Sequence, residues 1–245
     1  MRLRIGDFGL RIGNHGIAVL AGVALLLLPR GAGAQVGHAP ETSPYHDLRA
    51  KQAASFIGGF LSGQRGTPGV SPFRGPVVGI RYDRQVGTAA EVLIGISGAH
   101  LDHYIVDATQ PLATRTTGPV KGDLIFMETG FSLIVTGRKS WHGFVPYVGG
   151  MLGVAFETSL GTFNEFTFGT RGTVTPHVGL KWFPVQALAF KVEARDVIWR
   201  VKYPEPWFTP QSTDGEPVLE SGRDKAAEWL HHPTLMISLG YTFAY

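Results

Sequence analysis

The sequence predicts an all-β fold, an eight-stranded antiparallel up-and-down transmembrane β-barrel. Three observations support this fold class: an alternating final segment, an export signal at the start, and connections that alternate in length. The composition agrees, because 33 of the 245 residues are Gly, only 17% are charged, and none is Cys. A small scaffold held together by disulfides is therefore excluded.

The last thirteen residues, from Pro233 to Tyr245, have the pattern of an extended strand with one apolar face. One face carries Leu235, Ile237, Leu239, Tyr241, Phe243 and Tyr245, and the other carries Met236, Ser238, Gly240, Thr242 and Ala244. Successive side chains of a strand point to opposite faces. An apolar face backed by a small or polar one is typical of a strand in a membrane barrel.

The N-terminus has the pattern of a secretory signal peptide. Arg2, Arg4 and Arg11 precede an uncharged run over 17–28, which is followed by Pro29 and by small residues at 31–34. Twelve apolar residues are too few for a membrane-spanning helix, which needs about twenty. We expect cleavage after Ala34, so that residues 1–34 are a signal peptide, 35–51 a periplasmic lead and 52–245 the barrel.

The formal net charge of +3 does not indicate a nucleic-acid partner. Residues 1–34 contain four of the 22 basic residues and one of the 19 acidic residues. The chain without them has 18 of each, so its basic excess belongs to the signal peptide.

Alternation between Gly, Pro and polar breaks defines eight candidate strands. They lie at 54–61, 76–83, 89–100, 123–136, 143–157, 173–183, 188–203 and 234–245.

The connections between these strands alternate in length. The links after strands two, four and six are short, at 84–88, 137–142 and 184–187. The links after strands one, three, five and seven are longer, at 62–75, 101–122, 158–172 and 204–233. This parity is expected of a barrel with both termini in the periplasm, short inner turns and long outer loops.

The seventh candidate strand carries three charges on the face opposite its apolar residues. Lys191, Glu193 and Arg195 alternate with Phe190, Val192 and Ala194, so the charges are expected to face the lumen. After Asp196 the apolar residues change parity, which predicts a β-bulge near Asp196.

Inward charges on the other strands predict a paired network that fills the lumen. The full predicted set is Arg81, Glu91, Glu128, His177, Lys181, Lys191, Glu193 and Arg195. We expect the four residues Lys181, Lys191, Glu193 and Arg195 to pair with Glu91 and Glu128, because buried charges need partners. Such a lumen has no continuous water column; a path for protons or small ions, and catalysis, are the alternatives.

Two groups of residues are of the types found in metal sites or in catalytic sites, but their spacing or sequence context does not fit such sites. His100, Asp102 and His103 lie within four residues of an extended segment and do not converge on one point, so no metal site or cofactor is predicted. Ser97, Ser132 and Ser238 lie within strands that His177 could approach, as in a lipid-modifying enzyme. No local motif of such enzymes is present, and we expect a non-enzymatic protein.

The glycines at 149, 150 and 153 lie within a strand and not before a helix, so they do not form a phosphate-binding motif.

The C-terminus resembles the recognition signal of bacterial outer-membrane proteins, with polar Ser238, Gly240 two residues later, and aromatic Phe243 and Tyr245. This resemblance implies the barrel assembly machinery as a partner.

The strand count, the loop parity, the segment 146–156 and the terminal 240–243 together resemble the small outer-membrane β-barrel superfamily that includes OmpA-like and OmpX-like domains. The likeness covers about residues 52–245. It implies an outer-membrane location in contact with outer-membrane lipids, and its generic motifs indicate fold far better than activity.

The first functional hypothesis is a non-enzymatic outer-membrane barrel with a role in envelope integrity or in surface interaction through its long extracellular loops. The alternatives are a narrow channel or lateral route for small molecules, a lipid-modifying enzyme, and a soluble ligand-binding barrel, which would need its apolar face inside. No nucleic-acid partner is expected, and the sequence identifies no surface ligand.

Residues 221–230 in the last loop are expected to form a short helix or the rising edge of the last strand.

Overall fold

The structure is a computed structural model that describes residues 43–48, 51–158 and 166–243. The predicted signal peptide and Tyr245 lie outside these residues. Among the described residues, no helix has the length and apolar character needed to cross a membrane.

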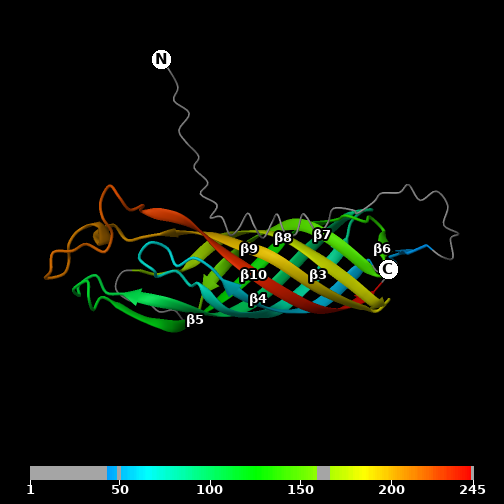
Figure 1. The fold of residues 1–245 in the computed structure, drawn as a ribbon, viewed down its shortest axis with the longest axis horizontal. Coiled ribbons are helices and arrows are strands. Elements are labelled where there is room, and N and C mark those ends of the chain that lie inside the picture. The colour runs from blue at the N-terminus through cyan, green and yellow to red at the C-terminus, as the bar shows by residue number, and fades with distance from the viewer. Residues whose placement is uncertain (1–42, 49–50, 159–165, 244–245) are drawn as a thin grey trace, which may run out of the picture. The chain divides into compact units, whose positions relative to one another are not determined.

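Eight long strands form a closed antiparallel barrel (Figure 1). They are β2 (Gln52–Ser62), β3 (Arg74–Gln85), β4 (Ala90–Val106), β5 (Thr116–Ile134), β7 (Phe144–Glu157), β8 (Thr170–Val185), β9 (Leu188–Lys202) and β10 (Ala227–Phe243). Each pairs with the next in the chain, and β10 pairs with β2 to close the wall. The predicted fold class is confirmed.

Two short strands and one short helix complete the described structure. Strand β1 (Tyr45–Asp47) pairs with β6 (Lys139–Trp141), so part of the lead before the barrel is ordered. A 3₁₀ helix spans Glu205–Phe208 in the last long connection. We call the end of the barrel with the long connections the outer end, and the end with the short turns the inner end.

The strands alternate between exposed apolar residues outside and buried residues inside. In β10, Leu235 and Ile237 are 59% and 63% exposed, whereas Met236 and Ser238 are at most 9% exposed. The alternation predicted for the final segment is therefore confirmed within its described residues.

Three strands are longer at the outer end than predicted. Strand β4 continues to Val106, β5 begins at Thr116, and β10 begins at Ala227. Their outer parts lack a continuous row of exposed apolar residues, and such a row is the sequence signal of a membrane strand. Of the residues 221–230, for which the sequence predicts a short helix or the edge of the last strand, 227–230 are the first residues of β10. Residues 221–223 form a turn.

The β-bulge predicted near Asp196 is wrong. The register between β8 and β9 is unchanged from His177↔Arg195 to Val174↔Ile198, and β10 pairs with β9 through Asp196 without a shift. The only irregularity between β8 and β9 is at the inner turn, between Trp182 and Val185. The apolar residues after Asp196 point into the barrel because the interior itself becomes apolar there.

The interior is thus divided along the barrel axis. The outer half and the connections above it form the apolar core, whose members are Ile57, Leu61, Val70, Val77, Ala99, Leu101, Val106, Ala108, Leu124, Phe126, Ala155, Phe168, Val197, Trp199, Val201, Tyr203, Trp207, Leu219, Leu230 and Met236. Trp199 lies in this core, with its ring 3.7 Å from His232 and 5.6 Å from Phe168 between centroids. The inner half is polar and charged.

Candidate functional site

The inner half of the lumen contains four cations and four carboxylates on the inward faces of β3, β4, β5, β8 and β9. The cations are Arg81, Lys181, Lys191 and Arg195, and the carboxylates are Asp83, Glu91, Glu128 and Glu193. Seven of these residues are buried, and the Glu91 side chain is 13% exposed. The numbers of opposite charges are equal, so the network is formally neutral.

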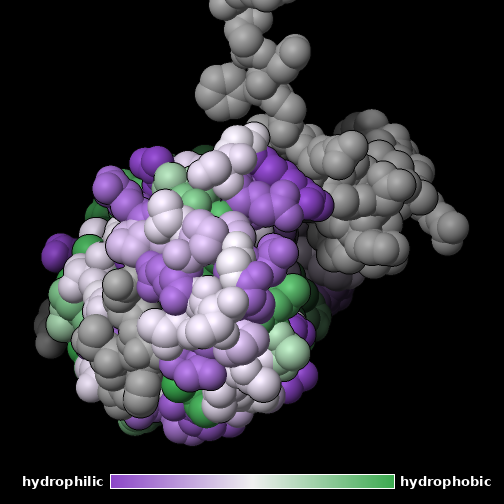
Figure 2. Space-filling view, turned by 90° about the vertical axis from the view of Figure 1, so that its left-hand side faces the viewer, coloured by the Kyte–Doolittle hydropathy of each residue, from purple (hydrophilic) through white to green (hydrophobic). Residues whose placement is uncertain are grey.

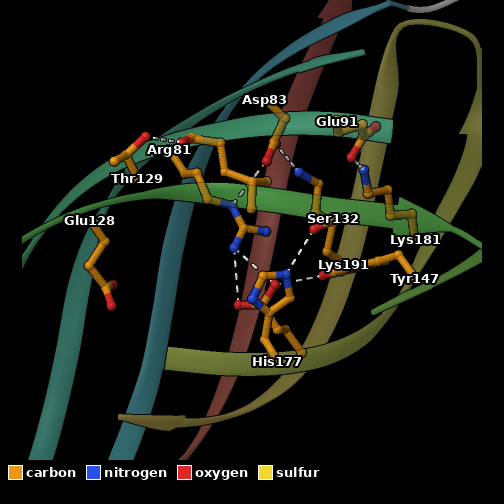
Figure 3. Close-up of polar contacts among 12 residues, drawn as sticks. Arg81, Asp83, Glu91, Glu128, Thr129, Ser132, Tyr147, His177, Lys181 and Lys191 are labelled. Atoms are coloured by element: carbon orange, nitrogen blue, oxygen red, sulfur yellow. Dashed lines mark hydrogen bonds and ion pairs between the residues drawn. The ribbon is translucent and has the colours of Figure 1, made fainter. Parts of the chain in front are cut away.

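The centre of the network is the pair between Arg81 and Glu193. Figure 3 shows Arg81 in this region, with Asp83 and Lys191 beside each other. Arg81 Nη1 donates to both carboxylate oxygens of Glu193, at 3.0 and 2.9 Å. The Tyr147 hydroxyl donates to Glu193 Oε2 at 2.8 Å. Arg81 Nε also lies 3.3 Å from Asp83 Oδ1, and Lys191 Nζ contacts the other oxygen of Asp83. These contacts join β3 to β9, two strands that β2 and β10 separate in the wall.

Two further ion pairs flank this centre. Lys181 contacts Glu91, and Arg195 Nη1 lies 3.3 Å from Glu128 Oε2. Thr175 Oγ1 donates to the other oxygen of Glu128 at 2.7 Å. Because each charge lies beside an opposite charge, the cost of removing it from water is offset.

The structure brings the predicted charged residues into one region but corrects their pairing. Lys181 with Glu91 and Arg195 with Glu128 are pairs from the predicted set. Lys191 and Glu193 instead contact Asp83 and Arg81. Asp83 was missed, although it lies two residues after Arg81 and so has the same inward parity.

His177 contacts a serine and not a carboxylate. Its Nε2 lies 2.8 Å from Ser132 Oγ, and both side chains are buried. Gly149 makes room for the ring, because a Cβ at this glycine would lie 2.7 Å from His177 Nε2 and 2.1 Å from the Phe131 carbonyl oxygen.

The Ser132–His177 pair lacks the third group of a catalytic triad. His177 Nδ1 has no hydrogen-bond partner among the described residues, whereas in a triad an acid orients this nitrogen. Ser97 and Ser238 are also buried, and the described structure records no hydrogen bond from either to His177.

The His100–His103 segment does not form a site. His100 Nδ1 lies 2.6 Å from Asp123 Oδ1, while Asp102 contacts Arg74 and Lys121. His103 is buried and has the opposite parity. The described part of the chain contains no group of three or more His, Cys, Asp or Glu residues that could hold a metal ion.

The predicted assembly residues lie along β10. Ser238 and Gly240 face inward, and a Cβ at Gly240 would lie 2.4 Å from Ser55 Oγ. The Phe243 ring lies near the rings of Tyr82 and Tyr241, with centroid distances of 6.5 and 6.3 Å. Tyr245 lies outside the described residues.

At the outer end, Arg115 joins two long connections. Its guanidinium donates to the carbonyl oxygens of Pro217 and Glu216 at 2.8 and 2.9 Å, although the two segments are about a hundred residues apart. The backbone N–H of Leu112 donates to Asp214 Oδ2 at 2.7 Å. The hydrogen bond from Ser212 is the main cause that lowers the pKa of Asp214 to about 2. Asp214 is therefore a carboxylate at neutral pH.

Glu228 joins the first long connection to the last. Its Oε1 accepts a hydrogen bond from the Thr67 backbone N–H at 2.6 Å and is contacted by the Tyr203 hydroxyl. Burial, followed by Glu228, raises the pKa of Tyr203. Gly66 has φ +77° and a Cβ there would lie 2.1 Å from the Tyr203 hydroxyl, so only glycine fits this close approach.

These connections form what we call the cap, residues 63–73, 107–115 and 203–226. Trp207 and Leu219 belong to the cap, and their buried side chains are part of the apolar core. Figure 2 shows the outer end of the barrel, where hydrophilic and neutral residues cover most of the face.

No protein-family model and no curated protein matches the chain. Solved structures with a similar fold include Neisserial surface protein A, at 12% identity over 82% of this chain and 98% of that chain, with a TM-score of 0.45. The outer membrane protein OprG from Pseudomonas aeruginosa is similar at 12% identity, over 83% and 100% of the two chains, with a TM-score of 0.45. The N-terminal β-barrel domain of Pseudomonas aeruginosa OprF is similar at 10% identity, over 79% and 99%, with a TM-score of 0.43.

The chain's own topology, eight antiparallel strands closed from β10 to β2, is that of a small up-and-down barrel. The resemblance predicted from the sequence is therefore confirmed at the level of the fold.

Proposed function

We propose that the protein is a non-enzymatic bacterial outer-membrane β-barrel that acts at the cell surface through its cap and not through its lumen. The location is supported by the reversal of the usual polarity, with large apolar side chains outside and ion pairs inside. The exposed outward residues include Phe56, Phe60, Val78, Ile80, Ile94, Phe131, Leu152, Val192, Leu235, Ile237 and Leu239. A surface of this kind is stable in lipid and aggregates in water.

The height of the apolar surface fits a bilayer. On β9 the outward positions from Leu188 to Ile198 span eleven residues, and a tilted membrane strand needs about 9–11. Asp196 is the single polar residue among them, and its carboxylate is bound by His231 Nδ1 at 2.6 Å.

One observation supports a role in surface interaction. Hydrogen bonds connect segments of the cap that are far apart in the sequence. Arg115 and Glu228 hold three connections in one arrangement above the apolar core. A surface that is ordered before binding loses less conformational entropy when a partner binds. A role in envelope integrity through the same cap is part of this proposal.

The filled interior favours this proposal over a channel. A solute that entered from the outer end would have to displace the apolar core, and then the ion pairs of the inner half. The buried Ser132–His177 pair gives less support to an enzyme, because no acid orients His177 Nδ1 among the described residues.

Location and orientation are testable together, because the chain contains no Cys and single cysteines can be introduced without background. Thr213→Cys lies in the cap, and Arg138→Cys lies in an inner turn; both positions are exposed. In intact cells, a membrane-impermeant maleimide should label the first variant and not the second, while both should react after lysis. Recovery of the protein in the soluble periplasmic fraction, or the reverse labelling, would contradict the proposal.

A further inference from the structure

The outward wall of β9 and β10 carries two cations and an aromatic residue above the apolar surface. Arg200 and Lys202 are exposed and lie two residues apart, so they share one face at a spacing of about 7 Å. Trp229 on β10 is directly opposite Arg200 and is 57% exposed. We call these three residues the basic face.

The two cations of the basic face have no ion pair within the described residues, unlike Arg74 and Lys121 on the neighbouring wall. Arg74 and Lys121 share Asp102, at 3.1 and 2.6 Å. On the face of β9 that holds the two cations, Asp196 already accepts the His231 side chain at 2.6 Å and the His232 backbone N–H at 2.8 Å. Within the described residues, Arg200 and Lys202 are thus available to an external anion.

The wall beside Arg200 is open. Gly172 precedes Thr173, which lies opposite Trp199, so Gly172 faces outward next to Arg200. A Cβ at Gly172 would meet no atom within 4 Å. A ligand can therefore approach the guanidinium along the wall.

The height of the basic face relative to the apolar surface indicates the source of the anion. Arg200 follows Ile198, the last outward apolar residue of β9, and lies where hydrocarbon gives way to headgroups in the proposed orientation. Tryptophan is enriched at this level of membrane proteins. A soluble polyanion would meet the cap first, whereas a lipid of the outer leaflet lies against the wall.

We propose that the basic face binds the phosphorylated headgroup of a lipid in the outer leaflet. Arg200 donates two parallel hydrogen bonds to a phosphate, Lys202 adds a second positive charge, and Trp229 packs against the adjoining sugar or acyl region. The inference rests on the proposed outer-membrane location and adds a ligand class that this location alone does not specify.

The test uses the full mature chain, folded in neutral detergent and titrated with bisphosphorylated lipid A or with the same lipid after enzymatic dephosphorylation. The double variant R200A/K202A is compared with R223A/K225A, which removes the same two residue types at the same spacing from the cap. We expect R200A/K202A to bind the phosphorylated lipid on the order of tenfold more weakly, since each cation near a lipid surface adds to binding. The R223A/K225A variant should bind like the wild type, and Trp229→Ala should weaken binding of both lipid forms.

Several outcomes would overturn the inference. These are equal binding of the two lipid forms by the wild type, equal losses in the two double variants, or competition by millimolar inorganic phosphate. Binding of a soluble sulfated polysaccharide that depends on Arg200 and Lys202 would assign the face to a different class of partner.

Failure of the inference can be told from failure of the proposed function. Each variant is first checked for insertion by its shift on a gel with and without boiling. A wild type that does not enter the outer membrane contradicts the proposed function, whereas an inserted barrel without phosphate selectivity contradicts only the lipid site.

Discussion

Glu193 has the most contacts of any carboxylate in the lumen. It accepts two hydrogen bonds from Arg81 and one from Tyr147 while its side chain is only 2% exposed. The inward direction of Glu193 could be predicted from the alternation of β9 alone. Its partner could not, because a pair between β3 and β9 depends on how the closed wall staggers its strands, and no single strand encodes that stagger.

Glu193→Gln should lower the stability of the barrel. The substitution removes the carboxylate that faces Arg81, and breaking a fully buried pair costs about 3–5 kcal/mol. The remaining contact of Arg81 with Asp83 places the expected loss near the lower value. The measurement is the urea midpoint for the shift between folded and unfolded bands on a gel.

Tyr147→Phe is the matched control for this prediction. It removes one hydrogen bond to the same carboxylate and leaves the ion pair, so the expected loss is smaller, about 1.5–3 kcal/mol. Equal midpoints for Glu193→Gln and the wild type would mean that the pair contributes nothing to stability.

At the scale of the element, β9 shows how a correct pattern led to a wrong conclusion. The change of parity after Asp196 predicts a bulge only if apolar residues face lipid along the whole strand. In the structure Val197, Trp199 and Val201 continue the inward face and pack under the cap. Trp207 and Leu219 of the cap fold back onto this inward face, and no periodic signal in the loop sequence predicts this packing.

Arg115→Ala should loosen the cap. The guanidinium is almost fully buried, and its loss leaves the carbonyl oxygens of Glu216 and Pro217 without their donor. Each hydrogen bond to a charged group contributes about 1.5–3 kcal/mol to stability. Because these bonds are lost, we expect proteinase K to cleave folded Arg115→Ala faster than the folded wild type within 209–216.

Arg223→Ala serves as the control, because Arg223 pairs with Glu220 in an exposed position, where an ion pair contributes little. Cleavage rates that rise equally in both variants would show that Arg115 does not hold the cap.

The final strand gives a separate prediction about assembly. Replacing Phe243 and Tyr245 together by Ser should lower the amount of inserted barrel, because the aromatic positions are those of the resembled recognition signal. Trp141→Ser is the control, since Trp141 is a 51% exposed aromatic in β6, outside the barrel wall. The quantity compared is the heat-modifiable fraction in outer membranes, and normal insertion of the double variant would make the sequence match accidental.

At the scale of the whole molecule, the lumen has two regions of different chemistry, one above the other along the barrel axis. Apolar side chains occupy the outer half, and ion pairs of zero formal net charge occupy the inner half. The strand count and loop parity of this architecture could be predicted, because both follow from local alternation and turn residues. The division of the interior could not, since it depends on loops folding back onto the barrel.

The filled interior predicts that the protein forms no large, steady pore. Reconstituted into a planar bilayer at neutral pH, the wild type should show no sustained conductance, because an eight-stranded barrel has room only for its own side chains. A stable, ion-conducting wild type would instead favour the hypothesis of a channel for small solutes.

The long sequence separation of the lumen pairs has a consequence for biogenesis. The four ion pairs that cross the lumen, Arg81 with Glu193, Lys191 with Asp83, Lys181 with Glu91 and Arg195 with Glu128, join residues 67–112 positions apart. The hairpin of β8 and β9 alone holds three of the cations against one carboxylate, and the hairpin of β3 and β4 holds one cation against two carboxylates. The lumen-facing charges of each hairpin are therefore unbalanced until the wall closes. Contacts between distant parts of the chain form late and slowly. Entry of separate hairpins into hydrocarbon is thus disfavoured, and we expect the barrel to insert into the bilayer as a single cooperative unit.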